Sequence, residues 1–509
     1  MLTKKQIYLL LIALCFLVYA NSLNNEFVSD DIPAIVENSY ISHPARYWLS
    51  PPMFLNSLCY LAVQDNPFLH HLVSITLHAI VTILVYFFLG LFFKGQGSLL
   101  GACLFAVHPI HSEAVTWVSG RLYIILALFI LTTFFLYYQA TLKIESGRRI
   151  NLKKYLIAII IFSYYIIHNL SFYFVFPLFL ILFDLTFGRW RKAWRWWLPF
   201  LVIVILRIIF ARGMIVERIS YVAGEMGGPV TWNNPIFNLV YSLFSHLGLL
   251  IWPAQLTLYH EPHVISAFML KVGIFSLVIL LFSLFFIFKK SKEIFLGMGI
   301  FVLFLAPTYS PMTVSWLLAE RYLYFPSIFL SIILVFFYER FLWKSERWRR
   351  LGLAFFILII VAYAVRTVDR NADWKTRERF WRKTTVVSDK SPRAYNNMGD
   401  VYSQEANPEG AIRAFKKAIE LKPDYADAYH NLAITYQQAG NIQEAIRCYQ
   451  QAVRFKPDLF ESHINLGVVY LNQGNYDLAI GHLKRAVEIR PDDANTRKAL
   501  NFAIQKQKR

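Results

Sequence analysis

Two adjacent aspartates, Asp30 and Asp31, follow the first long apolar stretch of the chain and are the residues best suited to acid-base chemistry. Neighbouring carboxylates offer one candidate general base and one partner that orients it or helps to hold a cation. Carboxylates beside apolar segments are costly to desolvate, so such a pair more often belongs to a functional site than to a surface loop without a role. The alternative interpretation is a solvated start of a loop, such as a helix N-cap.

Two arginines stand where later apolar stretches begin, and they are candidate anion-binding groups. Arg121 ends the polar segment 108–121, and Arg321 opens the apolar stretch 321–338. An arginine at membrane depth has few partners other than a carboxylate or a lipid phosphate, although each one alone also suits a snorkelling or helix-end residue. Together with Asp30 they describe an acidic base beside a cationic clamp for an anionic lipid headgroup. The other polar residues of these two segments are His108, His111, Glu113 and Glu320.

Residues able to bind metals are present, but their spacing is not that of a metal site. The histidines are His70, His71 and His78 near one apolar stretch, and His260 and His263 on either side of Glu261. No tight ligand spacing of the zinc type occurs among them. The cysteines Cys15, Cys59, Cys103 and Cys448 show neither metal nor disulfide spacing. We therefore predict no metal ligands, and the sequence leaves the use of a divalent cation open.

The composition indicates an integral membrane protein. Hydrophobic residues make up 57% of the 509 residues, whereas soluble domains usually have about 45–50%. The first stretch, Lys4 and Lys5 followed by 7–20, imitates a secretory signal peptide, but no convincing small-residue cleavage site follows it. We therefore interpret this stretch as a first membrane span that is retained.

Hydropathy predicts eleven membrane spans within the first 366 residues. The predicted spans are 6–22, 71–93, 98–110, 121–142, 154–168, 171–187, 196–211, 265–288, 294–308, 321–338 and 351–366. A further stretch, 236–252, is ambiguous, and we predict that it is a re-entrant or interfacial helix. If it crossed the membrane, two later clusters of basic residues would move to the outside, against the positive-inside bias.

The distribution of the +19 net charge sets the orientation. Lysines and arginines follow alternate spans in short clusters, for example at 143–154, 189–195, 289–292 and 340–350, and such clusters mark the cytoplasmic side. The segment with Asp30 and Asp31, the segment 108–120, the loops 212–264 and 309–320 and everything after 367 then share the opposite side. We therefore expect these loops on the non-cytoplasmic side of the membrane.

The last part of the chain has a period of 34 residues. Pro423, Pro457 and Pro491 are spaced by 34, as are Tyr402, Tyr436 and Tyr470, Ala411, Ala445 and Ala479, and Ala418, Ala452 and Ala486. This period is typical of the tetratricopeptide repeat. Small alanines let the two helices of a repeat approach, tyrosines and leucines fill the space between them, and proline ends the second helix.

The repeats predict a short solenoid with a concave groove that binds a protein or peptide. Asn397, Asn431 and Asn465 occupy equivalent positions of the first helices and are the candidate groove residues. A polar helix over about 494–509 closes the array. The predicted organisation is an all-α chain with a polytopic membrane helix bundle at 1–366, a linker and lead-in at 367–390, and three repeats with a capping helix at 391–509.

The loop motifs together resemble the transmembrane and tetratricopeptide-repeat-containing O-mannosyltransferases of the C-type glycosyltransferase superfamily, and especially their bacterial relatives. The motifs that carry the resemblance are Phe27-Val28-Ser29-Asp30-Asp31, His108-Pro109 with His111 and Glu113, Gly120-Arg121, Asn234-Pro235, Trp252-Pro253, Glu320-Arg321-Tyr322, and Trp374 to Trp381. Each motif is weak alone, but their joint order along the chain agrees with the family.

The resemblance implies a transferase that moves a sugar, usually mannose, from a polyprenyl-phosphate donor to a protein hydroxyl outside the cytoplasm, with inversion. Asp30 would be the general base with Asp31 beside it, and Arg121 and Arg321 would contact the donor phosphate. The surrounding pocket would be shaped by Glu113, His108, His111 and Glu320. The repeats would recruit the protein acceptor, and the resemblance to bacterial relatives implies a bacterial inner membrane with the active site and repeats on the periplasmic side. Because the basic residues fall in short clusters between apolar segments, we predict no nucleic-acid partner.

Two other functions stay open at this point. Polymerases and ligases of surface polysaccharides also join many spans to repeat tails, but they use diphosphate-linked oligosaccharides. The chain also departs from the family at His168 to Ser171 and at Leu122-Tyr123-Ile124. A non-enzymatic membrane anchor whose solenoid assembles partners is therefore the third hypothesis.

Overall fold

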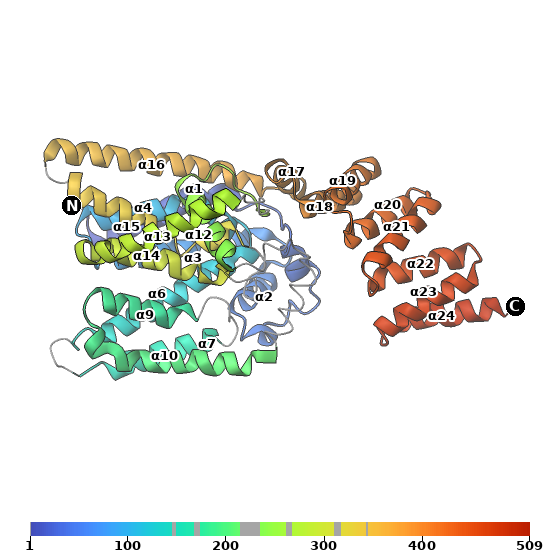
Figure 1. Cartoon of the computed structure of the whole chain (residues 1–509), viewed down its shortest axis with the longest axis horizontal. Coiled ribbons are helices and arrows are strands. Elements are labelled where there is room, and N and C mark those ends of the chain that lie inside the picture. Colours follow the sequence, from blue (N-terminus) through green and yellow to red (C-terminus); the bar gives the residue numbers. More distant parts are fainter. Residues whose placement is uncertain are drawn as a thin grey trace. The chain divides into compact units, whose positions relative to one another are not determined.

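The computed structural model describes residues 2–144, 149–166, 174–213, 235–260, 267–309, 317–342 and 345–508. Over these residues the chain is all-helical and has no strand, which confirms the predicted fold class (Figure 1). It divides into two compact units, Met1–Thr376 and Arg377–Arg509. His168 to Ser171, Glu261 and His263 lie outside the described residues.

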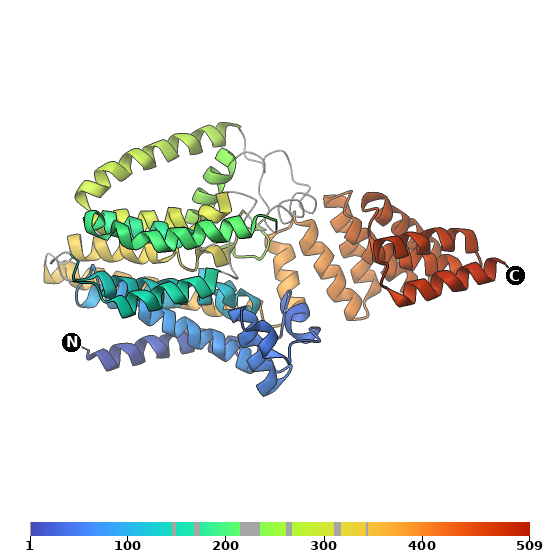
Figure 2. The same ribbon diagram turned by 90° about the horizontal axis from the view of Figure 1, so that it is seen from below.

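The first unit is a bundle of apolar helices (Figure 2). Its main helices are α1 (Lys4–Tyr19), α2 (Pro51–Val63), α3 (Pro67–Leu89), α4 (Gln96–Val107), α5 (Ser112–Thr116), α6 (Leu122–Thr141), α7 (Leu152–Ile166), α9 (Val175–Thr186), α10 (Trp190–Phe210), α12 (Pro235–Ile251), α13 (Ala267–Lys290), α14 (Lys292–Phe304), α15 (Ile328–Phe337) and α16 (Glu346–Asp373). Local signals set several helix starts. Thr3 and Gln6 form a capping box at α1, and the Ser345 side chain accepts a hydrogen bond from Trp348 at the start of α16.

Five helices of the described residues are long and apolar enough to cross a membrane, which supports an integral membrane protein. They are Lys4–Ser22, Pro67–Leu89, Ser119–Thr141, Trp190–Phe210 and Glu346–Asp373. A sixth span results if Gln96–Val107 and Pro109–Thr116, which are bent by 48°, count as one. The five single helices overlap predicted spans, and so does Gln96–Val107, whereas Pro109–Thr116 lies mostly in the predicted outer loop 108–120. The remaining predicted spans include shorter helices such as α9 and α14, so the total of eleven crossings and the re-entrant role of α12 stay predictions.

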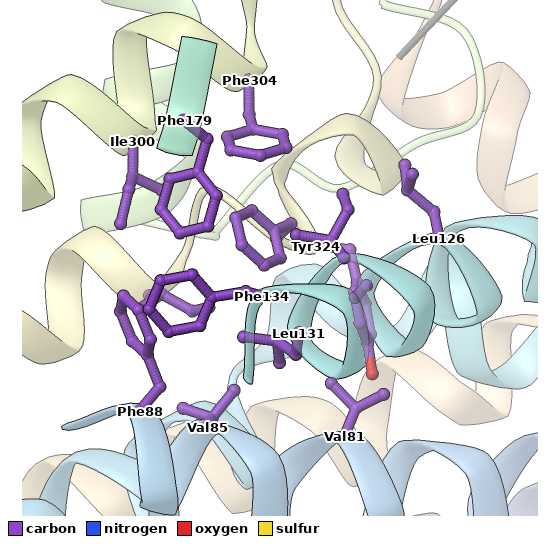
Figure 3. Packing of buried hydrophobic residues seen from close by; sticks show 14 of the residues in the cluster. Val81, Val85, Phe88, Leu126, Leu131, Phe134, Phe179, Ile300, Phe304 and Tyr324 are labelled. Atoms are coloured by element: carbon purple, nitrogen blue, oxygen red, sulfur yellow. The ribbon is translucent and has the colours of Figure 1, made fainter. Parts of the chain in front are cut away.

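Aromatic side chains hold the centre of this bundle together. Phe88 of α3 lies 5.4 Å from Phe134 of α6, measured between ring centroids, and Phe134 lies 5.3 Å from Phe179 of α9. Phe179 in turn lies 5.7 Å from Phe304 of α14. All four rings are buried, and Figure 3 shows them interlocked. Edge-to-face and offset pairs at these separations add about 0.5–1.5 kcal/mol each beyond burial, so this core fixes the helices whose ends carry the polar loops.

Arginine side chains connect neighbouring segments at both ends of the first unit. At one end, Arg189 donates a hydrogen bond to Thr141 Oγ1 over 2.7 Å, joining the start of α10 to the end of α6. At the other end, Arg366 near the end of α16 donates to the carbonyl oxygen of Pro253 over 3.2 Å. The loops with Asp30 and Arg321 lie at this second end. The structure thus groups the described parts of the predicted outer loops at one end of the bundle, while the side of the membrane stays a prediction.

The second unit consists of α17 (Arg377–Val387) and a helical repeat region, in which three helix pairs are followed by a terminal helix. The pairs are α18 (Pro392–Gln404) with α19 (Pro408–Leu421), α20 (Ala426–Gln438) with α21 (Ile442–Phe455), and α22 (Phe460–Asn472) with α23 (Tyr476–Ile489), followed by α24 (Ala494–Gln507). Ala411, Ala445 and Ala479 are fully buried between the helices. Asn407 and Asn475 cap α19 and α23 through their side chains.

The segment predicted as a linker, 367–390, is mostly helical. The apolar helix α16 continues to Asp373, and the two units meet at 376/377. α17 then packs against α18 as an extra helix ahead of the first repeat. The span prediction ended at 366 because hydropathy falls where Arg366, Asp369 and Arg370 appear, although a helix tolerates these residues outside the apolar region.

Replacing Gly399 with alanine is expected to destabilise the repeat unit by about 1–2 kcal/mol. An added Cβ on this α18 residue would lie 2.5 Å from the buried ring of Phe415 in α19, and overpacking of that kind outweighs the gain in helix propensity. The matched control is Gly481→Ala in α23, whose Cβ would meet no atom within 4 Å and which should stabilise slightly. Denaturant unfolding of both variants measures the difference, and equal behaviour would contradict this packing.

Candidate functional site

The Asp31 side chain connects the first outer loop to the second through hydrogen bonds. Its side chain is fully buried. One carboxylate oxygen accepts hydrogen bonds from the Ser119 backbone N–H over 2.7 Å and from the Ser119 hydroxyl over 2.5 Å, and the other accepts from the Val28 N–H over 3.4 Å. Burial raises the pKa of Asp31 to about 6, against the effect of these hydrogen bonds. Asp31 therefore holds the loop and has little capacity left for a ligand.

Asp30 has the opposite environment. It is exposed, directly before Asp31, and it follows Ser29, whose φ of 52° turns the chain at this point. Desolvation by the surrounding atoms raises the pKa of Asp30 above its ordinary value, while the nearby charge of Arg321 and a hydrogen bond from Ser29 lower it. Of the two aspartates, Asp30 is thus the one whose carboxylate can meet another molecule, as a general base must.

Arg321 is held by Glu113 through two contacts. Its backbone N–H donates to Glu113 Oε2 over 2.8 Å, and its guanidinium forms an ion pair with Glu113 Oε1. The guanidinium carbon also lies 5.7 Å from the ring centroid of Trp117 and 5.1 Å from that of Tyr322. This pair joins the second outer loop to η8 (Glu320–Leu323). Because Arg321 also interacts electrostatically with Asp30, the structure brings the predicted base and one predicted cation together.

Glu320 belongs to a second charged group at the end of α16. Arg370 donates to Glu320 over 3.1 Å and to Asp373 over 3.1 Å, and His260 Nε2 lies 3.8 Å from Glu320. Arg370 is 2% exposed, so its charge is compensated inside the protein. Sequence reasoning missed Arg370 and Asp373. The available signal was their spacing of three residues on a helix that continues past the apolar stretch.

Arg121 is fully buried and is bound by uncharged groups. Its Nε donates to the Ser74 hydroxyl over 2.9 Å, its Nη1 donates to Asn56 Oδ1 over 3.0 Å, and its Nη2 donates to the His70 carbonyl oxygen. A buried guanidinium whose hydrogen-bond partners are all neutral retains a positive potential, which the nearby charge of Asp31 offsets in part, and such a potential attracts anions. The predicted contact of Arg121 with a donor phosphate stays a prediction.

His108 and His111 connect the second outer loop to neighbouring helices. His108 Nε2 lies 3.0 Å from the carbonyl oxygen of Leu250 in α12, and its Nδ1 accepts from the Ile110 N–H over 3.2 Å. His111 Nε2 lies 2.8 Å from the Ser327 hydroxyl. Both rings are buried. These contacts connect the loop to α12 and to the residues just before α15, and the predicted place of both histidines in the pocket stays a prediction.

No group of three or more histidine, cysteine, aspartate or glutamate side chains suited to a metal ion occurs among the described residues. His78, one of the histidines noted in the sequence, lies with its Nδ1 2.6 Å from the Tyr324 hydroxyl and its Nε2 3.1 Å from the Ala106 carbonyl oxygen. His71 Nε2 lies 3.1 Å from the Asn25 carbonyl oxygen. These rings bridge helices and loops, and we assign no metal ligand.

The three candidate groove asparagines lie half-buried at equivalent positions of α18, α20 and α22. Asn431 donates to Asp400 Oδ1 over 3.0 Å and to Asn396 Oδ1 over 3.2 Å. Asn465 makes a side-chain hydrogen bond with Tyr449, and Asn397 also has an interaction partner. The asparagines therefore belong to polar networks of the first helices, and peptide binding by them stays a prediction.

The stability difference between wild type and Asp31→Asn is expected to change with pH. The folded-state pKa of Asp31, about 6, lies above its ordinary value of 3.8, so the folded protein binds the proton more tightly than the unfolded chain. Wild-type stability from this group should fall as pH rises from about 4 to 6, by about 3 kcal/mol. Thermal unfolding of both proteins at pH 4, 5, 6 and 7 measures this change. Parallel curves would contradict the buried position of this carboxylate.

Known proteins match this chain in the repeats alone and also over most of its length. Two family models of the tetratricopeptide repeat match residues 390–458 and 430–494. Protein O-mannosyl-transferase TMTC3 of Homo sapiens is 25% identical over 472 residues, covering 80% of this chain and 50% of the relative. Tmtc3 of Drosophila melanogaster is 24% identical over 511 residues, covering 82% and 55%.

A shorter match has higher identity. Protein O-mannosyl-transferase TMTC1 of Homo sapiens is 36% identical over 145 residues, which cover 24% of this chain and 16% of the relative. The chain spans about half the length of the TMTC3 relatives that it matches over most of its own length. These matches agree with the resemblance drawn from the loop motifs.

Proposed function

We propose that this chain, a homologue of the TMTC protein O-mannosyl-transferases that fits their family, transfers mannose from a polyprenyl-phosphate donor to a protein hydroxyl. The observation that carries the proposal is the exposed carboxylate of Asp30 within electrostatic range of the Arg321 guanidinium. The reaction takes place at the non-cytoplasmic face of a bacterial inner membrane. Asp30 and Arg321 supply the two functions that such a transfer needs, a base and an anion-binding cation.

The chemical step requires a proton acceptor and a stabilised leaving group. Asp30 accepts the proton of the acceptor hydroxyl while that oxygen attacks the anomeric carbon of the donor sugar. The bond from the anomeric carbon to the phosphate oxygen breaks, and the phosphate leaves with the electron pair. Attack from the face opposite the phosphate inverts the configuration. Arg321 and Arg121 stabilise the charge of the departing polyprenyl phosphate.

Fixed positions of these groups support the step. Three hydrogen bonds to Asp31 hold the backbone next to Asp30, and two contacts to Glu113 hold Arg321. Preorganised charges need no rearrangement during reaction, which is the main source of electrostatic catalysis. The paired group of Glu320 and Arg370 supports η8 from the side of α16.

The repeats recruit the protein acceptor. Their first helices present Asn397, Asn431 and Asn465 at one register, and solenoids of this kind bind extended segments along the surface formed by the first helices. Asp400 contributes a carboxyl group whose pKa burial raises to about 7, so near neutral pH it can donate as well as accept a hydrogen bond. An acceptor with backbone amides and hydroxyls suits this surface.

An assay of sugar transfer from two kinds of lipid-linked donor tests the proposed function. Membranes that contain the chain are given a radiolabelled polyprenyl-phosphate mannose, or in parallel a polyprenyl-diphosphate oligosaccharide, and transfer to protein is measured. We expect label in protein from the phosphate donor alone. Transfer only from the diphosphate donor would favour a polysaccharide ligase, and no transfer from either would favour a non-enzymatic scaffold.

A further inference from the structure

A cavity with charged and apolar lining residues lies at the end of the bundle that is remote from Asp30. It has a volume of about 870 Å³ and is formed by the start of α1, the end of α3, the start of α4, η9 (Tyr338–Leu342) and the start of α16. Pockets for small molecules usually occupy about 300–1,000 Å³. The cavity is therefore large enough for a headgroup and the first part of its lipid chains.

The charged residues of this cavity come from four separate segments. Lys4 opens α1, Lys94 lies between α3 and α4, Arg349 is in the first turn of α16, and Glu339 is in η9. Arg349 also pairs with the exposed Glu346 over 3.2 Å. Three cations of the lining thus lie near Glu339, and two further carboxylates act on this group: Glu346 pairs with Arg349, and the charge of Glu293 acts on Glu339. Cations from distant parts of the sequence converge on one space, as expected for an anion site.

The rest of the lining is apolar. Ile7 of α1, Tyr86 and Phe93 around the end of α3, and Leu99 of α4 form this part of the wall. A small inorganic anion needs no such surface. A molecule with a charged head and hydrocarbon chains covers both parts of the lining, and burial of apolar area contributes about 25 cal/mol per Å².

The position of the cavity separates it from the candidate catalytic site. It lies at the C-terminal end of α3, whereas His70 and Ser74, which bind Arg121, lie near the N-terminal end of the same helix. α3 has 23 residues and is therefore about 34 Å long. That length is close to the hydrocarbon thickness of a bilayer, so the cavity lies at the level of the opposite headgroup layer.

We propose that this cavity binds the phosphate headgroup of an anionic membrane phospholipid, with the acyl chains against its apolar wall. Lys4, Lys94 and Arg349 donate to the phosphate oxygens, and Glu339 limits the affinity because its charge repels the same group. The site is independent of the proposed sugar transfer. It ties the first apolar helix to the last one, because α1 and α16 would share one lipid.

Lipid binding by the purified full chain tests this inference. The protein in detergent is titrated with dioleoylphosphatidylglycerol, with dioleoylphosphatidylcholine, or with inorganic phosphate, and retained lipid is counted by native mass spectrometry. The test variant is Lys4→Gln/Lys94→Gln/Arg349→Gln. The control is Lys5→Gln/Arg340→Gln/Arg350→Gln, which changes the net charge equally at exposed positions next to lining residues.

We expect phosphatidylglycerol to bind wild type and control alike, and to bind the test variant at least about tenfold more weakly. Glu339→Gln should tighten binding. Equal binding of the lipid to the test and control variants would overturn the inference, as would full displacement by millimolar inorganic phosphate, which would show a site for the free anion. If the triple variant does not fold, the single variant Lys94→Gln tests the same site with a smaller change. It should weaken phosphatidylglycerol binding severalfold.

Discussion

Replacing Asp30 with asparagine is expected to lower the rate of sugar transfer by about 10²–10⁴-fold, with the thermal stability of the protein unchanged. Asparagine keeps the shape of the side chain but cannot accept the proton of the acceptor hydroxyl. Stability should not change because Asp30 is exposed and its carboxylate does not hold the loop, which is the function of Asp31. Radiolabel transfer from polyprenyl-phosphate mannose under single-turnover conditions measures the loss.

Glu37→Gln is the matched control for this experiment. Glu37 is an exposed carboxylate of the same loop, directly after η2 (Ile32–Val36), and its replacement should leave transfer within twofold of wild type. A loss that is equal in both variants would point to a general charge effect. Transfer by Asp30→Asn at the wild-type rate would remove this residue from the chemistry.

Replacing Glu113 with glutamine is expected to destabilise the first unit by about 3–5 kcal/mol. Glu113 is fully buried and Arg321 nearly so, and removal of one member of a buried ion pair leaves the other charge uncompensated in a medium of low polarity. Adding Arg321→Gln should restore part of the loss, because the second change removes that unpaired charge. Unfolding of the two single variants and the double variant forms a double-mutant cycle that isolates the pair.

Asp369→Asn provides the contrast for the buried pair. Its carboxylate also pairs with an arginine, Arg366, over 2.8 Å, but the aspartate side chain is 69% exposed. Exposed pairs contribute about 0–1 kcal/mol, so this change should be close to neutral. A double variant of Glu113 and Arg321 that is as unstable as the sum of the two single changes would contradict the coupling of these residues.

The repeats could be predicted almost completely from the sequence. A period of 34 fixes which residues face each other, so the buried Ala411, Ala445 and Ala479 follow from spacing alone. The membrane helices could be predicted less well. Hydropathy finds apolar segments, but it does not find α2, which lies in the first outer loop. It also does not find the last two turns of α16, which contain the charged residues Asp369, Arg370 and Asp373.

The candidate site was predicted in part. Sequence motifs selected the loops that carry Asp30, Glu113 and Arg321, and the structure brings these residues together. The sequence could not show that Asp31 points inward, because two adjacent residues of a loop differ only through contacts with distant segments such as that of Ser119. The partner of Glu320, Arg370, was missed for the same reason, since the two are 50 positions apart.

A structure with a polyprenyl-phosphate sugar bound would show directly whether Asp30 and Arg321 act on the donor. We expect the donor phosphate to lie against the Arg321 guanidinium, at the end of the bundle that carries Asp30. We expect the Asp30 carboxylate to lie within about 3.2 Å of the oxygen that attacks the anomeric carbon. A donor bound at the other end of the bundle, or an Asp30 carboxylate too far from the anomeric carbon to reach an attacking hydroxyl, would contradict the proposed sugar transfer.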